Sequence, residues 1–175
     1  MSRIFINYRR QDTEGYAGRL YDHLLRYFAV TDVFMDINDI SVGADFVTTL
    51  EDALAKCDVL LAVIGPQWIN VTDEFGNRRL EQPDDFVRLE IATAIMQEKR
   101  VIPVLVGGAR MPAEPMLSDD IKPLARRNAH VLSHKNFAAD VETLAETIRQ
   151  IVLDTRRGRA VRGASNSSEK AMLVK

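Results

Sequence analysis

One glutamate on a helix is the strongest candidate for chemistry in this sequence. The segment 84–106, DDFVRLEIATAIMQEKRVIPVLV, reads as a helix that runs into a buried strand. The helix has a single apolar stripe that would pack on a sheet, made of Val87, Ile91, Ala94 and Ile95. Glu90 lies at the border of this stripe, beside Phe86 four residues earlier. A carboxylate half turned toward a core costs free energy unless another group pairs with it.

The structural alternative is that Glu90 turns to water or pairs with an arginine such as Arg88 or Arg10. For a lone helical glutamate this is the commoner outcome, because glutamate is rarely fully buried. A functional role for Glu90 therefore depends on which other residues the fold brings to it.

The sequence predicts a fold of alternating strands and helices. Apolar runs predict five strands, at 3–8, 33–35, 58–64, 101–106 and 129–132, and amphipathic helices separate them, the last over 137–153. This alternation predicts an α/β class, a flavodoxin-like three-layer sandwich whose five-stranded parallel sheet has the strand order 2-1-3-4-5.

Composition divides the chain into one domain and a tail. Residues 1–153 form a body with a net charge of −6, whereas 154–175 carry six basic and two acidic residues. The tail, DTRRGRAVRGASNSSEKAMLVK, reads as a basic Gly/Ser-rich linker or disordered segment. An acidic body argues against a broad nucleic-acid surface, so no nucleic-acid partner is expected.

Targeting, redox and metal signals are weak. The one cysteine, Cys57, cannot form an internal disulfide, and His23, His130 and His134 lack the spacing of metal ligands, so no metal is predicted. The sequence has no apolar run of about 18 residues and no signal-peptide core. We therefore expect a soluble, cytoplasmic protein whose given segment makes no membrane contact.

Ligands of such sheets bind outside the carboxyl ends of the strands. Residues expected at that edge are Tyr8, Arg9 and Arg10 after strand 1, Asp36 to Gly43 after strand 2, Trp68 after strand 3, and the first turns of the Glu90 helix. Three common occupants of the fold are disfavoured. The segment YRRQDTEG after strand 1 has neither GxGxxG nor GxxxxGK[ST], strand 3 ends in IGPQW without a phospho-acceptor aspartate, and the chain lacks GxSxG.

Four segments together resemble a TIR (Toll/interleukin-1 receptor) domain of the bacterial type. They are IFINYRR at 4–10, VFMDINDISVGADF at 33–46, DVLLAVIGPQWIN at 58–70 and FVRLEIATAI…RVIPVLV at 86–106. The similarity extends from about Arg3 to Val152. Enzymatic members of that family cleave NAD+ at the nicotinamide–ribose bond, so NAD+ would be the substrate and no cofactor is implied. Their catalytic glutamate follows an aromatic residue by four positions, which Phe86 and Glu90 match, although the family aromatic is often tryptophan.

The resemblance also suggests roles for the neighbouring residues. Tyr8, Arg9, Arg10 and Asp36 would contact substrate, the arginines by holding the pyrophosphate. Phe34, Trp68 and Phe86 are candidates to stack on rings, although Phe34 and Trp68 are equally well explained as packing residues. The family's BB loop, through which its domains self-associate, corresponds to Asp36, Ile37, Asn38, Asp39, Ile40, Ser41, Val42 and Gly43.

The sequence is therefore consistent with two functions. The favoured one is an NAD+ nucleosidase, activated by association with other TIR domains, that yields ADP-ribose or a cyclic isomer in bacterial antiphage defence or signalling. The alternative is a non-enzymatic adaptor that acts only by protein–protein contact. An adaptor would not need a glutamate at position 90, so the presence of Glu90 beside Arg9 and Arg10 favours the enzyme.

Overall fold

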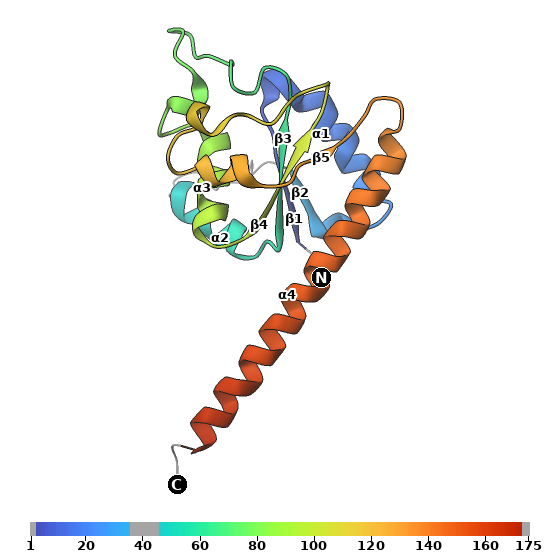
Figure 1. Ribbon diagram of the computed structural model, residues 1–175, viewed down its shortest axis with the longest axis vertical. Coiled ribbons are helices and arrows are strands. Elements are labelled where there is room, and N and C mark those ends of the chain that lie inside the picture. The colour runs from blue at the N-terminus through green and yellow to red at the C-terminus, as the bar shows by residue number, and fades with distance from the viewer. Residues whose placement is uncertain (1–2, 36–45, 173–175) are drawn as a thin grey trace.

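Five parallel strands form the centre of the domain (Figure 1). The computed structural model describes residues 3–35 and 46–172. Within them the sheet order is β2-β1-β3-β4-β5, as predicted. The strands are β1 (Ile4–Asn7), β2 (Val33–Met35), β3 (Val59–Ile64), β4 (Arg100–Leu105) and β5 (His130–Val131). The helices of the same residues are α1 (Arg10–Leu24), α2 (Phe46–Ala55), α3 (Phe86–Met96) and α4 (Phe137–Met172), with short 3-10 helices η1 (Val30–Asp32), η2 (Arg79–Glu81), η3 (Glu114–Met116) and η4 (Lys122–Arg126).

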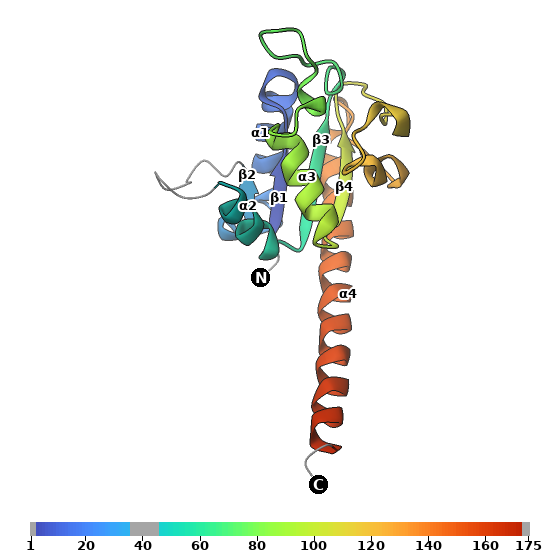
Figure 2. The ribbon, with the colours of Figure 1, turned by 90° about the vertical axis from the view of Figure 1, so that its left-hand side faces the viewer.

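Two apolar cores lie on opposite faces of the sheet. Figure 2 shows α2 and α3 in front of the strands and α4 behind them. Side chains alternate between the faces along each strand, so Ile4 and Ile6 of β1 join the core under α1 and α4, whereas Phe5 joins the core under α2 and α3. Every residue of β3 is buried, as a central strand covered on both faces requires.

The last helix is longer than the sequence analysis predicts. It does not end at Leu153 but continues to Met172 and projects away from the sheet in both views (Figures 1 and 2). Residues 154–172 contain arginine, alanine, glutamate and lysine, which favour helix, and no proline; the glycines cost about 1 kcal/mol each. The predicted helix end is therefore wrong, while the division of the chain at 153 into domain and tail stays a prediction.

None of the helices within residues 3–35 and 46–172 is both long and apolar enough to span a membrane.

Candidate active site

A cavity of about 280 Å³ opens where β1 ends and α3 begins. This is the carboxyl edge of the sheet beside the switch between β1 and β3, where open α/β sheets bind ligands. Its walls combine predicted and unpredicted residues: Ile6, Tyr8, Arg9, Arg10, Gln11, Arg79, Asp85, Phe86, Val87 and Glu90. The structure thus brings together Glu90, Phe86, Tyr8 and the two arginines as the strand order predicts.

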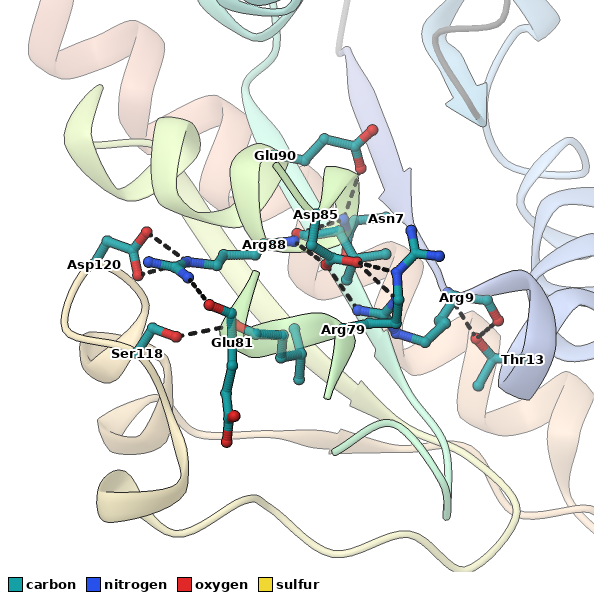
Figure 3. A network of polar contacts seen from close by, with 12 residues as sticks. Asn7, Arg9, Thr13, Arg79, Glu81, Asp85, Arg88, Glu90, Ser118 and Asp120 are labelled. Carbon is teal, nitrogen blue, oxygen red and sulfur yellow. Dashed lines mark hydrogen bonds and ion pairs between the residues drawn. The ribbon is translucent and has the colours of Figure 1, made fainter. Parts of the chain in front are cut away.

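Glu90 is held inside this cavity rather than turned to water. Only 9% of its side chain is exposed, between the core residues Val87 and Ile91 of α3. Asn7, fully buried at the end of β1, donates from Nδ2 to Glu90 Oε2 at 2.6 Å and to the Val87 carbonyl oxygen at 3.1 Å (Figure 3). One amide thus ties the carboxylate and the helix backbone to the central sheet.

A buried ion pair fixes the first turn of α3. The two terminal nitrogens of Arg9 donate to the two oxygens of Asp85 at 2.9 and 2.8 Å, and these side chains are 3% and 1% exposed. Asp85 is also the N-cap of α3, because its Oδ1 accepts from the Arg88 amide at 3.0 Å. Arg79 adds a longer contact from Nε to Asp85 Oδ2 at 3.4 Å. The start of the Glu90 helix is therefore anchored to the end of β1.

A second set of contacts holds the outer side of α3. Arg88 Nε donates to Asp120 at 2.9 Å, and its Nη1 donates to the Glu81 carbonyl oxygen at 2.9 Å (Figure 3). Ser118 Oγ donates to the Leu80 carbonyl oxygen at 2.9 Å. The alternative that Arg88 pairs with Glu90 is excluded, since the Arg88 side chain points to the opposite side of the helix.

The predicted role of Arg9 needs correction. Its terminal nitrogens already bind Asp85, so its first function is to support α3 rather than to hold a pyrophosphate. The cations of the cavity that lie nearer solvent are Arg10, which was predicted, and Arg79, which was not. Sequence reasoning could not find Arg79, because it lies in a polar stretch without periodicity.

Only two of the predicted aromatic contacts lie at the cavity. Phe86 lines it with 54% of its side chain exposed, and Tyr8 lines it half-buried. Trp68 is 1% exposed in the core under α2 and α3, so it presents no ring face to a ligand. Phe34 lies on the edge strand β2 under the guanidinium of Arg3 and does not line the cavity. For Trp68 the packing alternative is therefore correct, whereas Phe34 is 38% exposed and belongs to neither core, so the alternative that it is a core residue of strand 2 is wrong.

Two further polar residues that position Glu90 and its helix were missed. Asn7 is the one polar side chain at the end of an apolar run, and Asp85 directly precedes a helical pattern. Asn7 could have been noted as a polar residue at the end of a buried strand, and Asp85 as a candidate N-cap of the helix. The predicted loop residues Asp36 to Gly43 lie outside the described residues. Among 3–35 and 46–172, no group of three or more His, Cys, Asp or Glu side chains is placed to bind a metal.

Comparison with known families decides the identity of the fold. The sequence model of the TIR domain matches residues 4–146. The chain belongs to the TIR domain family. None of the curated proteins searched matches this TIR domain.

Solved structures agree on the architecture of this TIR domain. The TIR domains of the activated Roq1 resistosome that directly recognizes the pathogen effector XopQ are 14% identical, with a TM-score of 0.56 over 89% of this chain and 99% of that one. The TIR domain of the Toll-related receptor TRR-2 from Hydra magnipapillata is 18% identical, with a TM-score of 0.54 over 85% of this chain and 99% of that one. Similarity at this level establishes the shared fold.

Proposed function

We propose that this TIR domain is an NAD+ nucleosidase that cleaves the nicotinamide–ribose bond with Glu90 as the catalytic residue. The supporting observation is the placement of Glu90: a largely buried carboxylate on an anchored helix, lining a cavity that also holds an exposed aromatic ring and cationic side chains. Such a combination of convergent polar groups in a concave site is typical of ligand-binding pockets.

The reaction matches what a single carboxylate can do. Nicotinamide leaves as a neutral molecule, because the electrons of the cleaved bond neutralise its ring nitrogen, so the leaving group needs no general acid. The difficult species is the oxocarbenium-like ribose that remains. A fixed negative charge beside it lowers the barrier, and does so more effectively where water is largely excluded. Addition of water at the anomeric carbon, with loss of a proton, gives ADP-ribose, whereas addition of a nucleophile from the same molecule gives a cyclic isomer.

The remaining cavity residues are assigned by their chemistry. Phe86 offers an exposed ring for stacking, and Arg10 and Arg79 offer guanidinium groups that suit a pyrophosphate. At about 280 Å³, the cavity lies near the lower end of the ~300–1,000 Å³ range of small-molecule sites. It would therefore hold the nicotinamide ribose portion, with the rest of the dinucleotide outside.

Self-association is part of the proposal and rests on the family resemblance. If neighbouring domains complete each other's sites, nicotinamide release should rise more steeply than linearly with protein concentration, because the active species contains more than one chain. The measurement is the initial rate over a wide concentration range, with sedimentation velocity on the same samples. A strictly linear rate over a range in which the protein assembles would contradict shared sites.

The function itself is tested by incubating concentrated full-length protein with NAD+ and identifying the products by mass spectrometry. Release of nicotinamide together with ADP-ribose or its cyclic isomer supports the enzyme, and the second product tells hydrolysis from cyclisation. If wild type and Glu90→Ala are equally inactive under conditions that force assembly, the adaptor function is favoured instead. A role in defence signalling is proposed on the family resemblance alone.

Asn7 is expected to act as a positioning residue for Glu90. Asn7→Asp places a second carboxylate at the position that now donates to Glu90 Oε2 at 2.6 Å. Two carboxylates that share a site raise the pKa of one of them. The acidic limb of the pH–rate profile should therefore move to higher pH, and kcat at neutral pH should fall about tenfold or more.

The matched control for this variant is Asn136→Asp, which introduces the same change at an exposed position before α4. Its pH–rate profile should overlay that of wild type. An Asn7→Asp profile that is scaled down without moving would mean that Asn7 supports only the fold, and would contradict a positioning role.

A further inference from the structure

A second cavity lies at the edge of the sheet opposite the candidate active site. It has a volume of about 340 Å³ and opens at the amino ends of β4 and β5, beneath α4. The lining residues used below are Arg100, Arg127, Asn128, Thr147 and Ile151. The lining contains two arginines and no aspartate or glutamate. This cavity shares no lining residue with the Glu90 cavity. A proposal for it therefore does not depend on the proposed function.

The two arginines lack the partners that neighbouring arginines have. Arg126, the residue before Arg127, pairs with Glu114 at 3.0 Å, and Arg88 pairs with Asp120 at 2.9 Å. Among the described residues, no carboxylate lies within ion-pair distance, 4.0 Å, of Arg100 or Arg127. The Nε atom of Arg127 is also buried, and it has no hydrogen-bond partner among residues 3–35 and 46–172. A buried donor without a partner is costly, which favours binding of a hydrogen-bond acceptor at this position.

The electrostatics of the pair lead to the same conclusion. Burial, and after it the nearby charge of Arg100, lower the pKa of Arg127. Arginine side chains carry a positive charge in proteins. Two positive charges therefore face one cavity whose own lining has no aspartate or glutamate, and an anion between them would reduce their repulsion and could accept a hydrogen bond from the buried donor.

A neighbouring cavity contains acidic residues, and comparison with it shows why an anion should bind in the 340 Å³ cavity. A larger cavity of about 730 Å³ shares Arg100 and Arg127 with the 340 Å³ cavity. It also contains Lys99 and three acidic residues, Asp58, Glu98 and Asp154, so its charges balance. An anion would find no net positive charge there, whereas the lining of the 340 Å³ cavity carries the two arginines and no acidic residue.

We propose that Arg100 and Arg127 form a binding site for the phosphate group of a small phosphorylated ligand. Two guanidinium groups suit phosphate in geometry and number, because a dianionic phosphate neutralises both charges whereas a carboxylate leaves one. Asn128 and Thr147 lie within the same lining as further polar groups. Ile151 of α4, which is only partly buried, provides an apolar wall against which the organic part of the ligand can pack.

Binding should be visible as stabilisation of the full chain. The wall of the site belongs to α4, so a bound phosphate would add contacts between α4 and the β4–β5 edge. A ligand that binds only the folded state raises the unfolding temperature in proportion to the logarithm of its concentration.

The experiment measures binding of inorganic pyrophosphate and ribose 5-phosphate to the full chain by calorimetry, with the unfolding temperature as a second readout. Arg127→Gln and Arg100→Gln should each weaken affinity about tenfold or more. Arg126→Gln, which removes the same charge one residue away, should change it less than about threefold. Arg10→Gln, which removes a guanidinium proposed to hold pyrophosphate in the candidate active site, should bind both probes normally, and this result separates the two sites.

Several results would overturn the proposal. These are no saturable binding at millimolar phosphate, an equal loss of affinity in Arg126→Gln and Arg127→Gln, or acetate binding as tightly as the phosphates, which would indicate a carboxylate ligand. If Arg127→Gln fails to fold, Arg100→Gln decides alone, because Arg100 is solvent-exposed at the start of its strand.

Discussion

Glu90→Gln is expected to lower the rate of nicotinamide release from NAD+ by about 10² to 10³-fold. Glutamine keeps the size of the side chain and an oxygen that can accept the hydrogen bond from Asn7 Nδ2. What is lost is the negative charge beside the developing positive ribose. Removing one preorganised electrostatic group from an enclosed site typically costs about 3–4 kcal/mol of transition-state stabilisation. The measurement is kcat from product quantification at matched protein concentration.

Glu81→Gln is the matched control for this prediction. It removes the same charge from an exposed glutamate in η2, close to α3 but outside the cavity. Its rate should stay within about twofold of wild type, and sedimentation should show that all three proteins associate equally. Glu90→Gln with the activity of Glu81→Gln would rule out the proposed chemistry, because the charge at position 90 would then be dispensable.

Asp85→Ala is expected to reduce the free energy of unfolding by about 3–5 kcal/mol, because it leaves a buried charge without its partner. Arg9 is only 3% exposed and donates two hydrogen bonds to Asp85. The same substitution removes the N-cap of α3 and the Arg79 contact. For a chain of this size each 1 kcal/mol corresponds to about 2–4 °C, so the unfolding temperature should fall by about 10 °C. Chemical denaturation followed by circular dichroism measures the energy directly.

Two variants show which contact matters. Asp85→Asn keeps an oxygen that can cap the helix but removes the charge, so it should reproduce most of the loss. Asp119→Ala breaks the exposed ion pair with Lys122 and should leave the midpoint almost unchanged, since exposed pairs contribute little. If Asp85→Asn were as stable as wild type, helix capping rather than charge pairing would explain the role of Asp85.

Much of the architecture is predictable because it follows from local pattern. Each strand is an apolar run, each helix an apolar stripe, and their alternation limits the sheet to a parallel order with a switch beside the first strand. The same rule places Tyr8, Arg10 and Phe86 at one edge. The end of the last helix was not predictable in this way, because propensity in the polar residues 154–172 is too weak and too mixed to mark a boundary.

The sequence by itself determined the fold class, the strand order and the edge of the sheet at which Glu90 would lie, since these depend on residue type and period along a short stretch. Only the tertiary structure decided the partners: Asn7 with Glu90, 83 residues apart, and Arg9 with Asp85, 76 residues apart. It also decided that Trp68 belongs to the core and that Arg100 and Arg127 share a cavity. Such contacts depend on side-chain packing between distant segments, which no local pattern encodes.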